Sequence, residues 1–486
     1  MKYLLFIATL VISHCLFSQT ITGKIVDSEN NPIPYVTLQI GANYGVITND
    51  EGVFNLEVDN FSETDIVSIS CLGYKSVDYK LSDFNKEIYR LEASISELSE
   101  VFVTNKQLSV AEILEKVRAN SSENYAKEGA QRVFSRSTSN FELRDFDFDL
   151  VKSSNLKKSK IKTFNKEFED LKGNVVSKKS RYYEDVLVDL LKTSDSLQMA
   201  VIKATKLINE DKDLSTNSMN SKAIENAFAL LDSSATYKLK SGFFKLEDSL
   251  KIGDMIQDST KSNKGDTKGL KSQIARIIRN NTVSEDSKLE FIFEEDDYEH
   301  TIEGITNIDD ETAYIISFKP DKFSATYSGK MYVNTSDFAV VKLEYQYAEN
   351  KIGQRVSLKF LMGIKYEENA YRATVIFKKN NNEKYSPYFI SQESGNYVFL
   401  DRSLKFTRNN TSEQRGKQVL KLKLMVEQDF NSKTELYFIN NLDSENLVLE
   451  YKKEYPIVSL KQYDASIWKD YNVLTPVQAI IDYDKE

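Results

Sequence analysis

Alternation of apolar and polar positions marks two parts of the chain as β structure. Near the N-terminus, apolar residues at 67, 69 and 71 alternate with serines at 68 and 70, which is typical of a strand with one buried face. Near the C-terminus, segments rich in Tyr and Phe are separated by short polar turns and predict one large antiparallel sheet. These segments are 289–293, 298–308, 313–318, 325–334, 339–347, 355–366, 371–378, 397–404, 418–427 and 434–438.

The segments between these two parts carry helix signals. Four apolar residues recur at the spacing of one helix face, and a serine precedes them at the N-cap position. They are Val110, Ile113, Leu114 and Val117, after Ser109. Residues 94–130 are therefore expected to form a connector strand and an amphipathic helix, and residues 131–286 a mostly helical and loop insertion. Within the insertion we predict a strand over 133–143, helices over 149–170, 182–192 and 198–209, and loops over 211–221 and 258–271.

Turn residues divide residues 20–93 into short strands. Prolines open the second strand, and Gly52 supplies the left-handed conformation that the hairpin turn at 49–52 requires. The positions that carry the pattern are Gly23, Pro32, Pro34, Asp50, Gly52, Phe54, Gly73 and Tyr74. The pattern resembles the carboxypeptidase-regulatory-like domain, a transthyretin-like β-sandwich that Bacteroidota attach to many exported proteins. The resemblance implies a seven-stranded sandwich that acts as an accessory domain and not as a peptidase.

The C-terminal strands are similar to a second family. The strand and turn pattern resembles the curved half-barrel of LolA/LolB-like periplasmic lipoprotein carriers, and it is carried by 298–304, 314–320, 327–333 and 339–344. The resemblance implies a half-barrel over 287–486, closed by a strap over 463–473. A half-barrel offers a concave apolar face, which an open cavity would expose and packed helices would fill. The candidates for this binding face or for the strap are Tyr298, Tyr314, Tyr327 and Trp468. The fold class is thus mainly β with α.

The N-terminus has the pattern of an export signal. Met1-Lys2 precedes an apolar run over 3–17 that is too short for a membrane span, so residues 1–19 are predicted to be a cleaved signal peptide. Cys15 offers a lipoprotein alternative, which His14 disfavours because that position requires a small residue. We expect an exported protein in the periplasm or on the periplasmic face of the outer membrane. No later apolar run reaches the roughly 18 residues of a helical span, so no integral membrane span is expected.

Few residues remain for catalysis once the leader is removed. Of 2 Cys and 2 His, only Cys71 and His300 are left, so an intrachain disulfide is excluded. His300 and Glu303 match half of a zinc carboxypeptidase pattern, but on a strand they point to opposite faces and no second His is present. We expect Cys71 and His300 to be structural, with no catalytic residue, no cofactor and no metal. The acidic run 294–297 could bind calcium or form a solvated turn.

Net charge and domain order lead to the functional hypothesis. A formal net charge of −9 disfavours nucleic acid as a partner. The leading hypothesis is a non-enzymatic exported binding or assembly protein of the cell envelope. Its sandwich would be an adaptor, and its half-barrel would bind an envelope protein or a hydrophobic ligand such as a lipid or acyl chain. One alternative is a periplasmic lipid or lipoprotein carrier, which rests on the resemblance alone. The other is a hydrolase that uses carboxylates only.

Overall fold

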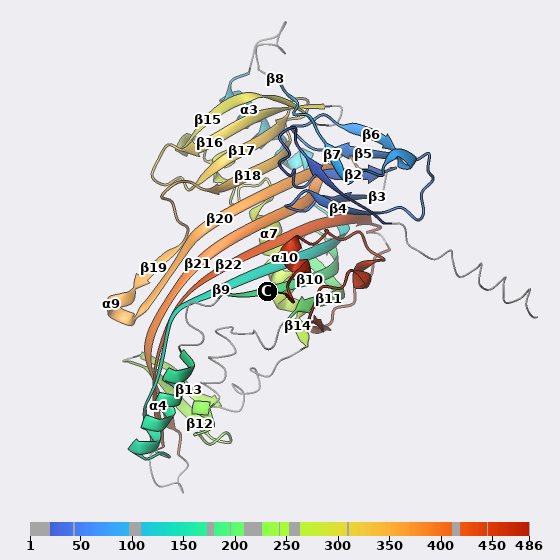
Figure 1. Ribbon diagram of the computed structural model, residues 1–486. Coiled ribbons are helices and arrows are strands. Elements are labelled where there is room, and N and C mark those ends of the chain that lie inside the picture. The colour runs from blue at the N-terminus through green and yellow to red at the C-terminus, as the bar shows by residue number, and fades with distance from the viewer. Residues whose placement is uncertain are drawn as a thin grey trace, which may run out of the picture.

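The computed structural model of the chain has one large curved sheet with a small N-terminal sandwich beside it (Figure 1). The structure describes residues 20–41, 44–96, 108–172, 179–194, 196–208, 226–242, 244–251, 263–308, 311–410, 418–444 and 446–485. The predicted signal peptide, the loop at 211–221 and most of the predicted connector strand lie outside these ranges. No helix in the described ranges is long and apolar enough to cross a membrane.

The N-terminal residues form two small sheets that enclose a core of their own. One sheet has the order β4-β1-β7, with β4 (Val53–Glu57), β1 (Thr20–Val26) and β7 (Ile88–Arg90). The other has the order β3-β2-β5-β6, with β3 (Tyr44–Ile47), β2 (Thr37–Ile40), β5 (Ile66–Ser70) and β6 (Val77–Lys80). Phe84, next to the short helix η1 (Leu81–Asp83), stacks on Phe54 and Tyr89 in this core. The predicted seven-stranded sandwich is confirmed.

The hairpin turn at 49–52 shows why its residues are needed. The Asn49 side chain accepts hydrogen bonds from the backbone N–H groups of Glu51 and Val53 at 2.9 and 3.0 Å. Gly52 has φ +71°, and a Cβ at this position would lie 2.5 Å from the carbonyl oxygen of Ile25. Only glycine fits both the left-handed conformation and this close approach. The turn therefore holds Asp50 at a fixed place on the surface of the sandwich.

The large sheet contains fifteen strands among the described residues, and most neighbours are antiparallel. The main path is β24-β11-β10-β9-β22-β21-β20-β18-β17-β16-β15-β8, with β12, β13 and β19 beside it. The first half in chain order is β8 (Ile95–Ser96), β9 (Gly129–Ser153), β10 (Lys179–Lys192), β11 (Leu197–Leu207), β12 (Thr236–Ser241), β13 (Phe244–Lys251) and β15 (Tyr298–Ile308). The second half is β16 (Glu311–Pro320), β17 (Tyr327–Asn334), β18 (Val340–Tyr347), β19 (Arg355–Leu358), β20 (Ile364–Lys379), β21 (Tyr385–Arg408), β22 (Val419–Leu442) and β24 (Val458–Leu460). The sheet curves without closing, as predicted, and β24 joins it parallel to β11.

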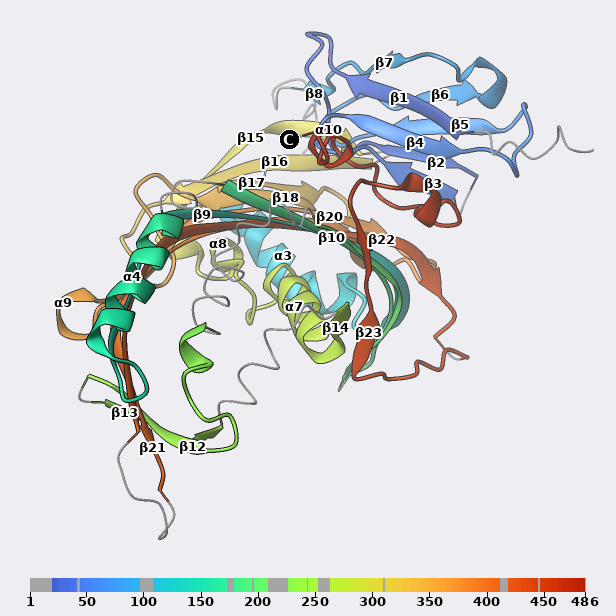
Figure 2. The same ribbon diagram turned by 60° about the horizontal axis from the view of Figure 1, so that its bottom comes forward.

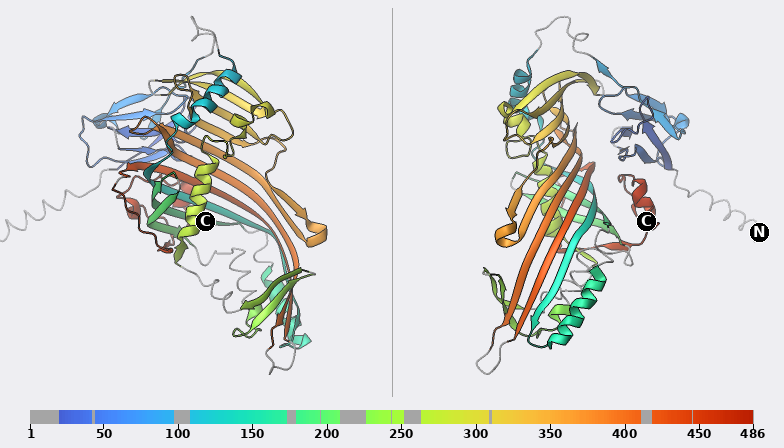
Figure 3. Two further views of the ribbon diagram at one scale, coloured as in Figure 1. Left: turned by 180° about the vertical axis from the view of Figure 1, so that it is seen from behind. Right: turned by 60° about the vertical axis from the view of Figure 1, so that its left-hand side comes forward.

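Three strands extend far beyond the rest of the sheet (Figure 3). β9, β21 and β22 have 25, 24 and 24 residues, so each spans about 80 Å at the usual rise of about 3.3 Å per residue. Their far ends have a separate core, in which Phe146 and Phe148 of β9 contact Phe168 of α4 (Lys158–Lys172). β12 pairs with β21 there and adds Tyr237 to the same core.

The two faces of the sheet carry different layers. α3 (Val110–Asn124), α7 (Thr267–Asn280) and α8 (Glu290–Phe293) cover the concave face (Figure 2). The sandwich, η3 (Ala465–Trp468) and α10 (Gln478–Ile481) lie on the convex face, where Trp468 packs edge-on against Phe134. β22 shows the alternation, because Leu436 and Phe438 belong to the concave core while Tyr437 belongs to the convex one. The predicted strap therefore packs against the sheet on its convex side.

Parts of the insertion differ from the sequence-based expectation. Residues 182–192 and 198–209, predicted as helices, form β10 and most of β11. β10 is an interior strand that is buried on both faces over 186–190, where Asp189 is the one polar residue, and such a stretch lacks the strict alternation that identifies a strand. Residues 289–293 were expected to be a strand but form the single turn of α8. The predicted loop 258–271 already contains β14 (Lys264–Asp266), paired with β23 (Glu454–Pro456), and the start of α7.

Candidate ligand cavity

The helix α7 is built to pack along the concave face. Its N-cap residue Asp266 accepts hydrogen bonds from the backbone N–H groups of Lys268 and Gly269, at 3.2 and 2.9 Å. Ile274 and Ile277 are buried against the sheet, while the opposite side of the helix faces solvent. The C-terminal half of α7 is partly separated from the sheet, and a cavity lies between the two.

This cavity has a volume of about 1000 Å³. It is bounded by α7, by the end of α3 and by the adjoining ends of β9, β10, β20, β21 and β22. Its apolar walls come from Ala130, Leu190, Leu197, Ala275, Ile278, Phe377, Phe438 and Leu442. The volume lies near the top of the usual 300–1,000 Å³ range for ligand sites, and the apolar patch lies among many polar groups, so the cavity suits a ligand with both an apolar and a polar part.

Positively and negatively charged side chains both surround the cavity. Arg279 comes from the last turn of α7, and Lys192 ends β10. The surrounding protein removes water from the ammonium group of Lys192 and thereby lowers its pKa. The carboxylates of Glu128 and Asp286 also lie at the cavity, and Glu128 accepts a hydrogen bond of 2.9 Å from the backbone N–H of Ser194. The arrangement can hold an apolar chain in its walls and a polar head at its rim.

Tyr125 separates the cavity from the main core. Its ring lies edge-on to Phe377 at 5.3 Å, and its hydroxyl donates to the carbonyl oxygen of Val340 at 2.8 Å. Burial raises the pKa of Tyr125 well above its usual value, so the hydroxyl is a neutral donor at physiological pH. The tyrosine is a structural wall of the cavity and carries no proton chemistry.

The predicted binding-face residues do not line this cavity. Tyr298, Tyr314 and Tyr327 are buried in the core beneath the helices, with 5–6% of each residue exposed. The Tyr298 hydroxyl donates to Glu290, and the Tyr327 ring packs against Phe291 of α8. Helices thus fill the concave face at these three tyrosines. Trp468 lies on the opposite face, under the sandwich.

Most of the cavity walls were not predicted from the sequence. Leu190 and Leu197 fall in or beside segments that were expected to be helical, so their place on the sheet could not be inferred. Phe377 and Phe438 lie in predicted strands, but strand alternation does not say which of two buried faces a residue occupies. One sequence feature did point to the cavity region: the residues of α7 form a strongly apolar helix face, and such a face must pack against another element.

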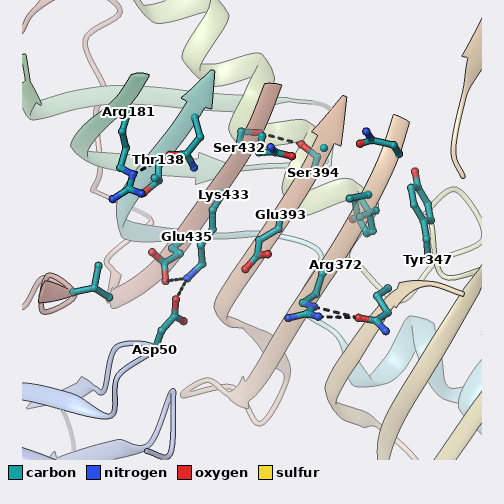
Figure 4. Close-up of a pocket in the computed structure, with 18 of the residues that line it drawn as sticks. Asp50, Thr138, Arg181, Tyr347, Arg372, Glu393, Ser394, Ser432, Lys433 and Glu435 are labelled. Carbon is teal, nitrogen blue, oxygen red and sulfur yellow. Dashed lines mark hydrogen bonds and ion pairs between the residues drawn. The ribbon is translucent and has the colours of Figure 1, made fainter. Parts of the chain in front are cut away.

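A second, polar groove of about 810 Å³ crosses the convex face (Figure 4). Arg372, Glu393 and Lys433 stand side by side on β20, β21 and β22, and Arg372 donates to the Gln346 side chain at 3.2 and 3.1 Å. Lys433 donates to Glu435 at 2.9 Å and to Asp50 of the sandwich. Burial raises the pKa of Glu435, and the ammonium of Lys433 offsets part of that rise. The groove holds charges that join the sandwich to the large sheet.

The residues that carry the sandwich pattern have structural places. A Cβ on Gly23 would lie 2.7 Å from the Phe54 ring, and Gly73 has φ +94°. Pro32 forms a bridge with Val26, and Tyr74 forms one with Ala93. Pro34 lies between this bridge and β2. Asp50 differs from the rest, because it contacts Tyr35 within the sandwich and Lys433 on the large sheet.

The residues considered for catalysis or metal binding lie apart. The Nε2 atom of His300 is 2.8 Å from the carbonyl oxygen of Phe291, and burial lowers the His300 pKa. Cys71 follows β5 directly, not mid-strand as expected, and burial raises the pKa of its thiol. In the acidic run, Asp297 accepts from Lys322 and Ser324 at 2.7 and 2.6 Å. Within the described ranges, no three His, Cys, Asp or Glu side chains are grouped to hold a metal ion.

Comparison with known families agrees with the architecture of the first domain. Residues 21–103 match the model of the CarboxypepD_reg-like domain. The predicted identity of the N-terminal sandwich is thereby confirmed. No curated protein matches the chain.

The solved structures include three similar chains. A LolA superfamily protein from Nitrosomonas europaea aligns at 12% identity over 66% of this chain and 94% of its own, with a TM-score of 0.19. MucB in complex with MucA(peri) aligns at 8% identity over 72% and 100%, with a TM-score of 0.16. A putative membrane-associated protein of unknown function from Bacteroides fragilis aligns at 9% identity over 86% and 98%, with a TM-score of 0.12. TM-scores this low add no argument about this chain.

Proposed function

We propose that the chain is a non-enzymatic, exported binding protein of the cell envelope that holds the apolar chain of a lipid or acylated ligand in the concave cavity. The observation that carries this proposal is the cavity of about 1000 Å³, whose walls include an apolar patch with Leu190, Ile278 and Phe377 and whose rim carries Arg279 and Lys192. An acyl chain suits such walls, because burying each methylene contributes about 0.8 kcal/mol. A charged or polar head group would remain at the rim.

The sandwich acts in this proposal as a rigid adaptor. It is fixed to the convex face by hydrogen bonds from Tyr437 to the Gly45 carbonyl and from Lys378 to the Thr37 hydroxyl, both 3.0 Å. The cavity opens on the concave side, so a partner bound to the sandwich would leave it accessible. Export to the periplasm belongs to the same proposal and is supported by the apolar run at the N-terminus.

The test is binding of a fluorescent fatty acid to the full chain, with native mass spectrometry for co-purifying lipid. Ala275→Glu places a carboxylate on the cavity side of α7 and is expected to weaken binding at least tenfold, because a buried charge there is costly to desolvate. Ser272→Glu adds the same charge on the exposed side of α7 and should bind like the original protein. No saturable binding, or equal loss in both variants, would refute the cavity as the site.

The proposal that the protein is not an enzyme is tested by a separate measurement. The purified protein should leave ester and peptide substrates intact at the rate of a buffer control. Hydrolysis that survives purification and follows the protein through gel filtration would contradict the non-enzymatic proposal.

A lipid carrier is the alternative function. It differs from a static binding protein because it exchanges its bound lipid with membranes. Transfer of the bound fluorescent acyl chain from donor to acceptor vesicles, faster than without protein, would favour carrying over static binding.

A further inference from the structure

Two large apolar side chains stand fully in solvent at the β19–β20 hairpin, on a side of the large sheet away from the sandwich. They are Phe360 and Leu361 of α9 (Lys359–Met362), the single turn between β19 and β20 (Figure 1). Phe360 is 103% exposed and Leu361 is 84% exposed. We call these two residues the apolar tip. A soluble surface seldom exposes two such adjacent side chains without a function in binding.

The tip is held rigidly although its side chains contact little. Gly363, which ends α9, has φ +60°, and a Cβ there would lie 2.1 Å from the Asp401 carbonyl oxygen. Its own carbonyl accepts the backbone N–H of Asp401 at 2.7 Å. Arg402 of β21 donates to the carbonyl oxygen of Met362 and to the Ser241 hydroxyl. The backbone is therefore built to present Phe360 and Leu361 outward.

Further exposed apolar residues continue from the tip along the same edge. Val356 and Leu358 of β19 are exposed, in a strand whose four residues all face solvent. Phe323, in the turn between β16 and β17, is 97% exposed, and Lys351 joins it to the segment that enters β19 by donating to its carbonyl at 2.7 Å. The apolar surface thus comes from two separate turns and one edge strand. This surface protrudes from the sheet at the β19–β20 hairpin.

The segment that carries the tip is rich in cations. Residues 350–362 contain Lys351, Arg355 and Lys359 and no carboxylate, and Arg355 is paired with Glu367 of β20 at 2.9 Å. The ammonium of Lys359 lies 4.0 Å from the centre of the Phe399 ring and makes no ion pair with any carboxylate in the described ranges. Cations beside exposed apolar side chains, on flexible stems that reach toward head groups, are the combination that favours an anionic bilayer surface.

We propose that the apolar tip inserts into the head-group region of an anionic lipid bilayer, with Lys351 and Lys359 contacting the anionic head groups. This contact is independent of the proposed ligand cavity, which lies near the other end of β20. From Ile364 to Phe377 the strand rises about 40 Å, so a membrane at the tip leaves the cavity free. The chain would then be a peripheral membrane protein that touches the bilayer through one end.

The first test places a reporter at the tip of the full chain. Phe360→Trp should show a blue-shifted emission with phosphatidylglycerol vesicles and quenching by brominated acyl chains. The native Trp468 is 2% exposed and gives a constant background. Val448→Trp is the matched control, because Val448 is 91% exposed in the segment before β23, on the other side of the molecule (Figure 2). It should show neither effect.

The second test removes the contact. Phe360→Ser with Leu361→Ser should lower co-flotation with phosphatidylglycerol vesicles about tenfold or more, with an unchanged melting temperature because both side chains are exposed. Lys351→Glu with Lys359→Glu should weaken binding to these vesicles but not to phosphatidylcholine. Val448→Ser with Tyr451→Ser should bind normally. The proposal is overturned by an absence of co-flotation, by equal losses in the control, or by a native dimer that the tip variant dissociates.

Discussion

Replacing Lys433 by Met tests whether a buried charge cluster fixes the sandwich to the large sheet. Lys433 joins Glu435 of its own strand to Asp50 of the sandwich. The side chains of Lys433 and Glu435 are 17% and 8% exposed, whereas that of Asp50 is 42% exposed. Solvent screens Asp50, so the main cost of Lys433→Met is an unpaired carboxylate at Glu435. Losing one partner of a buried ion pair typically costs about 3–5 kcal/mol, and we expect this loss at neutral pH.

The loss should depend on pH in a definite sense. Burial raises the pKa of folded Glu435 above the value of about 4.3 in an unfolded chain, so the native state holds the proton more tightly. Stability from this group is therefore full below the unfolded pKa and falls as pH rises through the folded one. Lys433→Met removes the ammonium that lowers the Glu435 pKa, so the folded pKa rises further. The destabilisation should be larger near pH 8 than near pH 5, where the carboxyl is more readily protonated.

Denaturant unfolding followed by tryptophan fluorescence is the direct assay. The chain has 1 Trp, and Trp468 lies in the convex core beside the sandwich, so its emission follows this interface. Lys423→Met is the matched control, because Lys423 is an exposed lysine of the same strand and should change stability by less than about 0.5 kcal/mol. A loss below about 1 kcal/mol, or an equal loss at both pH values, would refute the reasoning.

Three further outcomes are expected. Trp468→Ala should lower stability by about 3–5 kcal/mol, because it removes a large side chain that is 2% exposed; a melting temperature equal to that of the original protein would contradict this packing role. Residues 20–93 expressed alone should show a β-type circular dichroism spectrum and one cooperative unfolding transition, since their core is their own; a disordered spectrum would mean that docking is required for folding. His300→Ala should leave peptidase and esterase readings at background, and metal analysis of the original protein should find no stoichiometric zinc; zinc together with His300-dependent hydrolysis would oppose both the structural role of His300 and the non-enzymatic proposal.

The sandwich and the curved sheet could be predicted because their strands alternate and their turns have strong signals. Gly52 is the clearest case, since one residue type fits its turn. The three longest strands, β9, β21 and β22, were predicted only in part. β22 was expected as 418–427 and 434–438, because the polar stretch through Asn431 and Ser432 interrupts the apolar pattern in the middle of the strand. Asn431 faces the polar groove on the convex side, where no apolar packing is needed.

The cavity could not be predicted, because its walls are set by how elements pack. Leu190 lies in a strand that is buried on both faces, where apolar and polar residues do not alternate, so the sequence does not show that this segment is a strand. Tyr298, Tyr314 and Tyr327 show the converse case. Their aromatic type and alternation were correct signals for a concave face, but whether helices cover that face depends on α3 and α8, which come from separate parts of the chain.

The last described segment has a consequence for the order of folding. The Asn49 side chain donates to the carbonyl oxygen of Pro476 across 427 residues, and the Asn55 backbone N–H donates to the Thr475 hydroxyl across 420 residues. Gln478 similarly donates its backbone N–H to Glu51. We expect the sandwich to fold on its own core, but these clasps wait until the chain is synthesised past Gln478. Contacts this distant in sequence form slowly, because the entropy cost of closing a long loop comes before the contacts can stabilise it. The contacts from Lys378 and Tyr437 can hold the first domain on the sheet earlier, so the clasps at 475–478 complete its docking and seal the convex core around Ile47 last.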